Sequence, residues 1–318
     1  DCTLEGNQKA TFDVFLPAWL PGADAHASLV GGPTLFERFK AYWHAIMADA
    51  AQIELPDRWL SDVIRANQVH ILLAARNEDA GRRVAPWIAA DRYVTAIDSE
   101  GSSVVRGMQA LGHDEFARRS FEYFFSKYQP DGYMTTGYTL MGGGWHLWTL
   151  GEFVRLSDDR AWFAQVADKP ASLARWAVDE LAKTRHRRPA GSKLPEFGLM
   201  TPGVLADWQN YAYYFYANGY YVAGLDAIGR ALRAVGHPDA PRLLAESAQL
   251  REETLRAYRW SQARAPLVGL RDGTWVPYSP ASVHTPGPIG DFFPGQDANR
   301  SWAYDVELGS HHLVPQGV

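Results

Sequence analysis

Residues 196–224, EFGLMTPGVLADWQNYAYYFYANGYYVAG, decide the architecture that we expect for this chain. Glycine and proline break any helix in the first half of the stretch, so we predict a loop there. From about residue 210 the aromatic residues recur at a spacing compatible with a helix, which ends near Gly224. Asp207, followed by Trp208, lies where the predicted loop meets the predicted helix. The stretch therefore predicts one carboxyl group in an apolar setting at the start of an aromatic helix.

Two interpretations of Asp207 are open at this point. Apolar surroundings disfavour the charged form of a carboxyl group and raise its pKa toward the working pH. On that interpretation Asp207 is a catalytic acid, and Trp208 and Tyr213 offer faces on which a sugar ring stacks. The alternative is a structural aromatic helix for which Asp207 is the N-cap.

The composition argues against several functional classes. The chain has 318 residues, 47% hydrophobic and 21% charged, so it can bury a large core. A formal net charge of −5, with no basic cluster beyond residues 185–188, argues against nucleic acid or an anionic membrane as a partner. The apolar runs are too short to span a membrane, and one cysteine forms neither an internal disulfide nor a zinc cluster. Twelve tryptophans and fifteen tyrosines exceed the needs of a helical core and are common in carbohydrate clefts.

The sequence leaves the compartment open. Residues 1–20 lack the basic start and the apolar segment of a signal peptide. A secreted chain whose signal had been removed would show the same pattern, so a cytoplasmic and a secreted or periplasmic location both remain. The oligomeric state is equally open.

One strand followed by helical hairpins is the expected order of elements. Residues 11–19 alternate apolar and polar and predict a β-strand, with a linker to residue 33. Thr34 caps a predicted helix within residues 34–56, and residues 57–318 read as helical hairpins. Short turns follow Leu111, Leu156 and Val235, whereas long loops are predicted at 81–91, 129–145, 186–209 and 265–300. Because short and long connections alternate, we expect the long loops at one end, where a functional site belongs.

Three smaller features complete this prediction. Pro170 is expected to break or kink the helical stretch 160–185. Residues 273–278, GTWVPY, predict a short strand, and residues 301–313 predict the start of another helix. The glycine-rich residues before Trp145 are expected to be loop.

Acidic residues in or beside the predicted loops are candidates for chemistry. Asp98 and Glu100 lie in AIDSEGSSVV, and Glu307 lies in SWAYDVELGSHH. Glycoside hydrolysis needs two carboxyl groups at the scissile bond, one protonated as acid and one ionised as base or nucleophile. The alternative roles are plain: Asp98 or Glu100 as an acid at a helix N-terminus, and Glu307 as a solvated helix residue.

Histidines form a second set of candidates: His146, His284, His311 and His312. Adjacent residues of a helix point apart, so His311 and His312 do not suggest a metal site, and we expect neither a metal nor another cofactor. His146 paired with a tyrosine would be the signature of a polysaccharide lyase, which abstracts a proton with tyrosine or histidine.

Three stretches carry a resemblance to a known group of enzymes: residues 96–134, from AIDSEGSSVV to QPDGYM; residues 142–163, GGGWHLWTLGEFVRLSDDRAWF; and residues 197–225, FGLMTPGVLADWQNYAYYFYANGYYVAGL. They resemble segments of the six-hairpin, (α/α)6-toroid glycosidases, which include glucoamylase-like, trehalase-like and glucosidase-like bacterial enzymes. The resemblance covers roughly residues 57–313 and is poorly specific for a substrate. It implies a mainly α chain with an (α/α)6 toroid of helical hairpins.

The resemblance also implies roles for single residues. Members of the group commonly carry a β-sandwich before the toroid, so residues 1–33 resemble the end of that domain and residues 34–56 its linker helix. Asp207 corresponds to the general acid, and Asp98 and Glu100 to residues that grip the non-reducing sugar. Where many relatives have Trp-x-Arg-Asp, this chain has Ala96 to Glu100 without the arginine.

In the glycosidases that the chain resembles, the general base usually lies late in the toroid. The chain has fewer predicted helices than six hairpins need, so we expect an incomplete toroid. The base is then either absent from the chain or provided by Glu307.

The sequence thus favours a glycoside hydrolase, inverting by resemblance, acting on a carbohydrate substrate. Asp207 and Glu307 are the candidate catalytic residues, and the candidate substrate contacts are Asp98, Glu100, Trp145, His146, Trp148, Trp208 and Tyr213. The alternatives are a polysaccharide lyase or sugar phosphorylase on the same toroid, and a carbohydrate-binding protein without catalysis.

Overall fold

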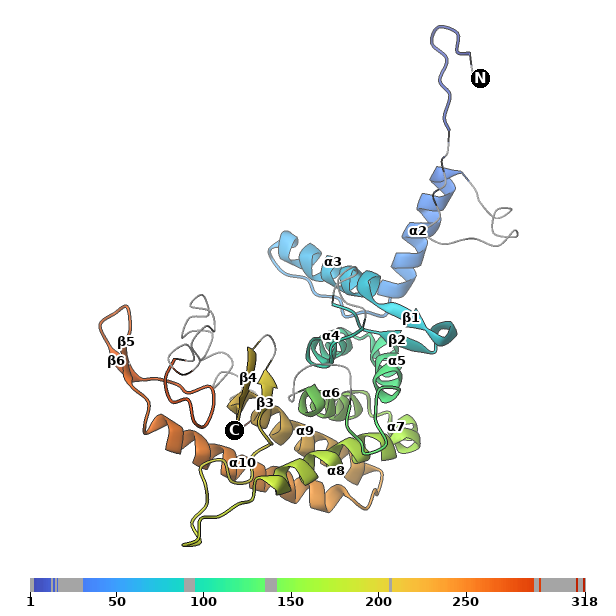
Figure 1. Cartoon of the computed structure of the whole chain (residues 1–318). Helices are drawn as coiled ribbons and strands as arrows, with labels where there is room; N and C mark the ends of the chain where they lie inside the picture. Colours follow the sequence, from blue (N-terminus) through green and yellow to red (C-terminus); the bar gives the residue numbers. More distant parts are fainter. Residues whose placement is uncertain are drawn as a thin grey trace. The chain divides into compact units, whose positions relative to one another are not determined.

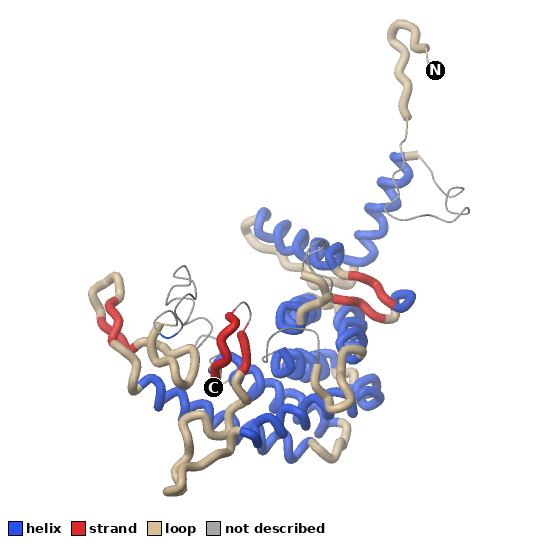
Figure 2. The backbone as a smooth tube through the Cα atoms, viewed as in Figure 1, coloured by secondary structure: helices blue, strands red, loops and turns tan. Residues whose placement is uncertain are grey.

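The computed structural model divides the chain into two compact units, Asp1–Glu54 and Leu55–Val318 (Figure 1). It describes residues 3–12, 14, 16, 31–88, 95–134, 142–205, 208–288, 292, 313 and 317, with only the backbone of 205 and 208–210. These residues are mainly helical, as predicted, and Figure 2 shows the few short strands between the helices.

The first unit contains one described helix, α2 (Gly32–Met47). It begins two residues before the predicted cap at Thr34, with a proline in its first turn, a position that proline tolerates. The strand expected over residues 11–19 is absent at the four of those residues that the structure describes. Three of them, Phe12, Val14 and Leu16, are exposed. A single strand gains stability only from a partner, and no strand of the described part of this unit supplies one.

The second unit consists of helical hairpins with three small β-hairpins between them. The helices are α3 (Arg58–Ala74), α4 (Asp98–Ala110), α5 (Asp114–Phe125), α6 (Gly142–Ser157), α7 (Arg160–Val166), α8 (Asp168–Lys183), α9 (Phe215–Ala234) and α10 (Ala240–Gln262), with a 3₁₀ turn at Asp79–Gly81. The strands pair antiparallel as β1 (Arg76–Glu78) with β2 (Arg83–Ala85), β3 (Gly203–Leu205) with β4 (Trp208–Ala212), and β5 (Leu267–Gly269) with β6 (Trp275–Pro277). The predicted strand in GTWVPY is therefore confirmed as β6.

The helices pack in two rows around one core. In the first row α4 lies beside α6, and α6 beside α9; in the second, α5 contacts α7 through aromatic rings and α8 contacts α10. Short turns join α4 to α5 and α9 to α10, where Gly112 and Gly236 adopt the left-handed backbone that glycine favours. The break expected near Pro170 is present at Ala167, between α7 and α8. The toroid itself is not established by this packing.

Glycines allow α6 and α9 to approach unusually closely. A Cβ atom at Gly144 would lie 2.8 Å from the backbone carbon of Tyr220, and one at Gly151 would lie 2.5 Å from that of Ala227. The expectation that the glycine run before Trp145 forms a loop is therefore wrong, since α6 already begins at Gly142. Glycine propensity disfavours a helix, but here the tight seam between the helices decides the conformation.

The aromatic helix of the opening stretch begins later than predicted. Strands β3 (Gly203–Leu205) and β4 (Trp208–Ala212) pair antiparallel, and α9 starts only at Phe215. Tyrosine and tryptophan suit strands as well as helices, so the pattern at residues 208–214 was ambiguous. The helix expected at residues 301–313 lies outside the described residues, apart from Leu313.

Candidate functional site

The described segments that follow α8 and α10 meet at the end of the second unit where α9 begins. Tyr214 forms a β-bridge with Ser282, and the backbone N–H of Phe215 donates to the carbonyl of Ala281 at 3.0 Å. The side-chain oxygen of Asn218 accepts from the N–H of Met200 at 2.9 Å, which ties the loop after α8 to the first turn of α9. This is the end at which α4, α6 and α9 begin, so it is the end where the sequence placed a site.

Asp98 is the most unusual acid at this end. It opens α4, and its side chain is only 2% exposed. A Cβ atom at Gly142 would lie 2.0 Å from the carboxyl carbon of Asp98, so the carboxyl group abuts the first residue of α6. The N–H of Ser99 donates to it at 2.8 Å. Burial raises the pKa of Asp98 from its ordinary 3.8 to about 7, so the group exchanges a proton near neutral pH.

Two tyrosines and a second acid surround this carboxyl group. Burial, and next the negative charge of Asp98, raise the pKa of both Tyr133 and Tyr221, so both phenols keep their protons. Glu100 is half-buried and accepts a hydrogen bond from the hydroxyl of Ser99. The group thus combines one proton-exchanging carboxyl, one further carboxylate and two hydroxyl donors.

Trp145 and Trp148 lie on α6 and pack against a second, smaller buried cluster that includes Tyr216 and Tyr220. The ring of Trp145 stacks on Tyr220 of α9, with centroids 4.2 Å apart and an angle of 12°. The guanidinium of Arg106 lies 4.2 Å above Trp148. Both tryptophans are half-buried, so each retains an accessible part, but one face of each is already covered.

A cavity of about 350 Å³ lies between α6, α9 and α10 and is bordered by Trp148. Its charged lining includes two paired acids: Glu152 is 2.7 Å from Arg155, and Asp226 is 2.8 Å from Arg230. Because these acids are neutralised by neighbouring arginines, the described lining of the cavity lacks the unpaired carboxyl that hydrolysis requires. The candidate site is therefore placed at the loop end and not in this cavity.

His146 is a core residue, and its predicted role as a substrate contact is wrong. It is 0% exposed and lies among the rings of Phe121, Phe124, Phe125 and Tyr128. Neither ring nitrogen has a hydrogen-bond partner among the described residues, and burial lowers its pKa from 6.5 to about 3. Helical periodicity turned His146 into the core while its neighbour Trp145 packs against the smaller cluster, a distinction that the sequence alone did not reveal.

The structure describes only some of the remaining predicted site residues. Asp207 and Glu307 lie outside the described residues, and only the backbone of Trp208 is described, within β4. Tyr213 is half-buried directly before α9, and its ring lies 6.1 Å from that of His284. Burial, and next Glu196, raise the pKa of Tyr213.

Sequence reasoning missed Glu196, Tyr133 and Tyr221. Glu196 is largely buried and accepts from the imidazole Nε2 of His284 at 3.2 Å. Tyr133 stands next to the turn Asp131–Gly132 in a long loop, which was the available signal. Tyr221 is one of several tyrosines in a buried helix, and nothing local distinguishes it.

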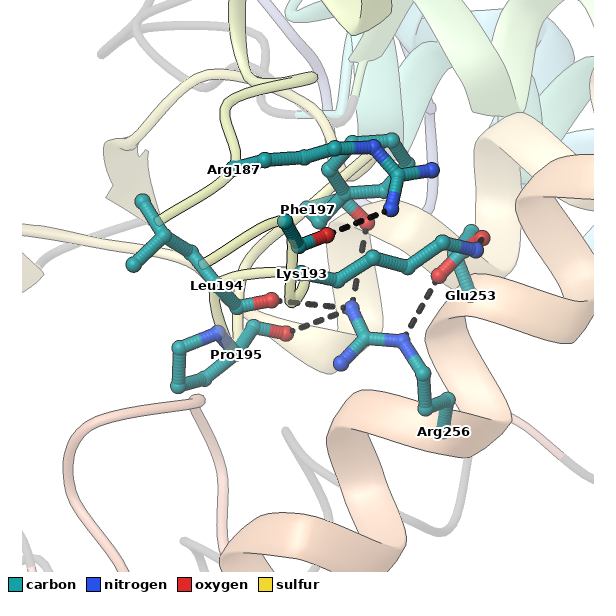
Figure 3. Close-up of polar contacts among 8 residues, drawn as sticks. Arg187, Lys193, Leu194, Pro195, Phe197, Glu253 and Arg256 are labelled. Atoms are coloured by element: carbon teal, nitrogen blue, oxygen red, sulfur yellow. Dashed lines mark hydrogen bonds and ion pairs between the residues drawn. The ribbon is translucent and has the colours of Figure 1, made fainter. Parts of the chain in front are cut away.

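A partly buried ion-pair network fixes the loop that carries Glu196 (Figure 3). Arg256 of α10 donates to the carbonyls of Leu194, Pro195 and Phe197 at 3.1, 3.0 and 3.3 Å. Glu253 accepts from Arg256 at 2.7 Å and also pairs with Lys193. The side chain of Glu253 is only 5% exposed, so a substrate cannot reach it. We therefore assign Glu253 a structural role.

Comparison with known proteins adds no family to this picture. No protein-family model matches the chain, and no curated protein is significantly similar to it. Among the described residues no cluster of three or more His, Cys, Asp or Glu side chains is arranged to hold a metal ion. None of the described helices is both long and apolar enough to cross a lipid bilayer.

Proposed function

We propose that the chain is a glycoside hydrolase that cleaves a glycosidic bond in an oligosaccharide or glycoside by carboxylate acid–base catalysis, with inversion at the anomeric carbon. The observation that carries the proposal is the buried carboxyl group of Asp98 beside two phenols at the loop end. A carboxyl group that is protonated near neutral pH, close to hydroxyl donors, suits sugar binding and proton transfer. The two rows of hairpins are compatible with the toroid that we propose for the fold.

We assign the roles as follows. Asp207, between β3 and β4 in sequence, remains the proposed proton donor to the leaving oxygen. Asp98 and Glu100 bind the sugar or activate water, and Trp145 and Trp148 border the substrate path. Glu307 remains the proposed base.

The two enzymatic alternatives, a polysaccharide lyase and a sugar phosphorylase, have less support. The lyase was expected to use His146, which is buried in the core and does not reach substrate. A phosphorylase would need an anion site, for which residues 185–188 are a poor candidate, and Arg185 is paired with Glu246. The third alternative, a carbohydrate-binding protein without catalysis, is distinguished from a hydrolase by the experiment below.

The test is a hydrolysis screen of aryl glycosides and oligosaccharides with the wild type, Asp98→Asn and Asp207→Asn. We expect sugar release by the wild type and a loss of about 10²-fold or more in each variant, as for removal of an acid–base group. The matched control is Asp168→Asn, an exposed acid near the opposite end that pairs with His237. Proton NMR of the first product follows its anomeric configuration.

Three results would contradict the proposal. Sugar binding without release by the wild type would indicate a binding protein. Full activity of both variants would remove the assigned carboxyl groups from the mechanism. Ultraviolet absorbance of an unsaturated uronate product would indicate a lyase.

A further inference from the structure

A second cluster of side chains lies at the loop end, outside the surroundings of Asp98. Glu196, Tyr213, Trp260 and His284 come from four separate segments of the chain. The ring of His284 lies 6.1 Å from that of Tyr213 and 5.9 Å from that of Trp260, edge to face in both cases. Its Nε2 is 3.2 Å from a carboxylate oxygen of Glu196.

Backbone pairing holds the cluster together. The N–H of Val283 donates to the carbonyl of Tyr213 at 3.2 Å, which places His284 beside Tyr213. Glu196 is held from the other side, because Arg256 binds the carbonyls of its neighbours Pro195 and Phe197. The side chains are thus positioned by ordered segments before any ligand arrives, which lowers the entropic cost of binding.

The cluster is accessible and offers both donors and acceptors. The side chain of His284 is 51% exposed, whereas that of Glu196 is 17% exposed. The contact between Nε2 and Glu196 leaves Nδ1 of His284 as a further polar atom of the cluster. The phenol of Tyr213 is a donor, and its raised pKa keeps the proton in place.

The cluster lies apart from Asp98 on the same end of the molecule. Tyr221, which neighbours Asp98, lies within α9, whereas Tyr213 precedes that helix. At 1.5 Å per residue their positions differ by on the order of 10 Å along the helix axis. A ligand that spans both places must therefore be longer than one sugar ring.

We propose that Glu196, Tyr213, Trp260 and His284 form a distal subsite that binds a further sugar of a neutral oligosaccharide. The proposal rests on the proposed hydrolase function and adds a preference for longer substrates. The hydroxyl groups of a sugar can pair with the donors and acceptors of the cluster. The aromatic rings of the cluster can pack against the faces of the sugar ring. Arg264 lies 3.9 Å above the ring of Trp260, so Tyr213 offers the more open face. Glu196 lies in the cluster and Arg264 lies beside it, so neither sign of charge is favoured, and the proposed ligand is a neutral sugar.

The first experiment measures kcat/KM on neutral gluco-, manno- and galacto-oligosaccharides of increasing length. We expect His284→Ala and Glu196→Gln to lower the ratio of kcat/KM for the longest to the shortest substrate by about tenfold, the effect of one lost charge-assisted hydrogen bond. The control is His237→Ala, which removes another histidine with a carboxylate partner at 3.2 Å, in the turn between α9 and α10. That variant should keep the wild-type ratio. Thermal unfolding of each variant checks that it folds.

The second experiment separates this inference from the proposed function. Binding of the same oligosaccharides to Asp207→Asn, which removes only the proposed proton donor, is followed by tryptophan fluorescence, with and without His284→Ala. Binding that His284→Ala weakens supports the subsite even when no sugar is released by the wild type. Hydrolysis with an unchanged length ratio in His284→Ala overturns the subsite and leaves the hydrolase function standing. Absence of any oligosaccharide binding overturns the subsite as well.

Discussion

At the scale of single residues, Asp98 places a carboxyl group where folding disfavours its charge. Its pKa is about 7 in the folded chain and 3.8 when unfolded, so between these values the folded protein binds the extra proton. Stability contributed by this proton is present below about pH 4 and is lost as the pH rises through 7. At alkaline pH the raised pKa of Asp98 lowers the free energy of unfolding by roughly 4 kcal/mol.

We therefore predict that Asp98→Asn stabilises the protein at pH 8 while it lowers activity. The amide keeps the shape and the hydrogen-bonding capacity without the charge. Urea unfolding at pH 8 and pH 4 measures the effect, and the gain of the variant over the wild type should shrink toward pH 4. An equal difference at both pH values would mean that charge burial is not its cause.

His146 has the opposite dependence on pH. Its pKa is about 3 in the folded chain and 6.5 when unfolded, so the unfolded chain binds the extra proton between these values. Stability therefore falls as the pH is lowered from 6.5 to 3, by on the order of 5 kcal/mol.

We predict that His146→Phe reduces the loss of stability at acid pH. Phenylalanine fills a site already lined by Phe121, Phe124 and Phe125, and removes two nitrogens without partners. Urea midpoints between pH 7 and pH 4 compare the variant with the wild type, and Asp98 contributes equally to both. Parallel curves would show that His146 does not govern acid sensitivity.

At the scale of elements, the seam between α6 and α9 depends on glycine. A methyl group at Gly151 would collide with backbone atoms of Ala227, which cannot rotate away as a side chain can. The contrast is Gly107 of α4, which is exposed and has nothing within 4 Å of an added Cβ.

We predict opposite effects for the same substitution at these two positions. Gly151→Ala should destabilise the protein by about 1–3 kcal/mol, as overpacking does. Gly107→Ala should stabilise it by about 0.5–1 kcal/mol, because alanine is the better helix former. Thermal and urea unfolding measure both variants, and a loss of stability in Gly107→Ala would refute the assignment of that face as open.

The helices could be predicted from sequence because periodicity and local breakers specify them. The mainly α class, the break before Pro170 and the strand within GTWVPY followed from such local signals. The glycine run at the start of α6 and the late start of α9 did not, because close helix packing and strand pairing are tertiary effects. The same limit applied to the site: Asp98 was found from its acidic motif, but nothing local revealed its burial or its tyrosine neighbours.

At the scale of the whole second unit, the candidate site depends on segments that are distant in sequence. Arg256 on α10 holds the loop with Glu196, and that loop reaches the segment before α9 through His284 and Tyr213. No short motif could announce this arrangement, since each contact spans many residues. A substitution in α10 should therefore alter the loop that carries Glu196.

We predict that Arg256→Ala loosens residues 186–200. The variant loses three hydrogen bonds to backbone carbonyls and leaves Glu253 with only Lys193. Trypsin should cleave the native variant after the exposed Arg187 severalfold faster than it cleaves the wild type, because local opening costs less. The control is Arg259→Ala, an exposed arginine further along α10. Equal cleavage of all three proteins would show that the loop is held by other contacts.

The seam between α6 and α9 also limits how this protein can be engineered. When side chains collide, a second substitution to a smaller residue can restore the fit. Here the obstacle is backbone: a Cβ at Gly224 would lie 2.4 Å from the carbonyl oxygen of Gly144. No substitution of a neighbouring residue can make a backbone carbonyl group smaller. A glycine substitution between α6 and α9 therefore cannot be compensated by a second substitution nearby. Directed evolution should accept changes on the outer faces of the hairpins and return the wild-type glycines at the seam in every surviving clone.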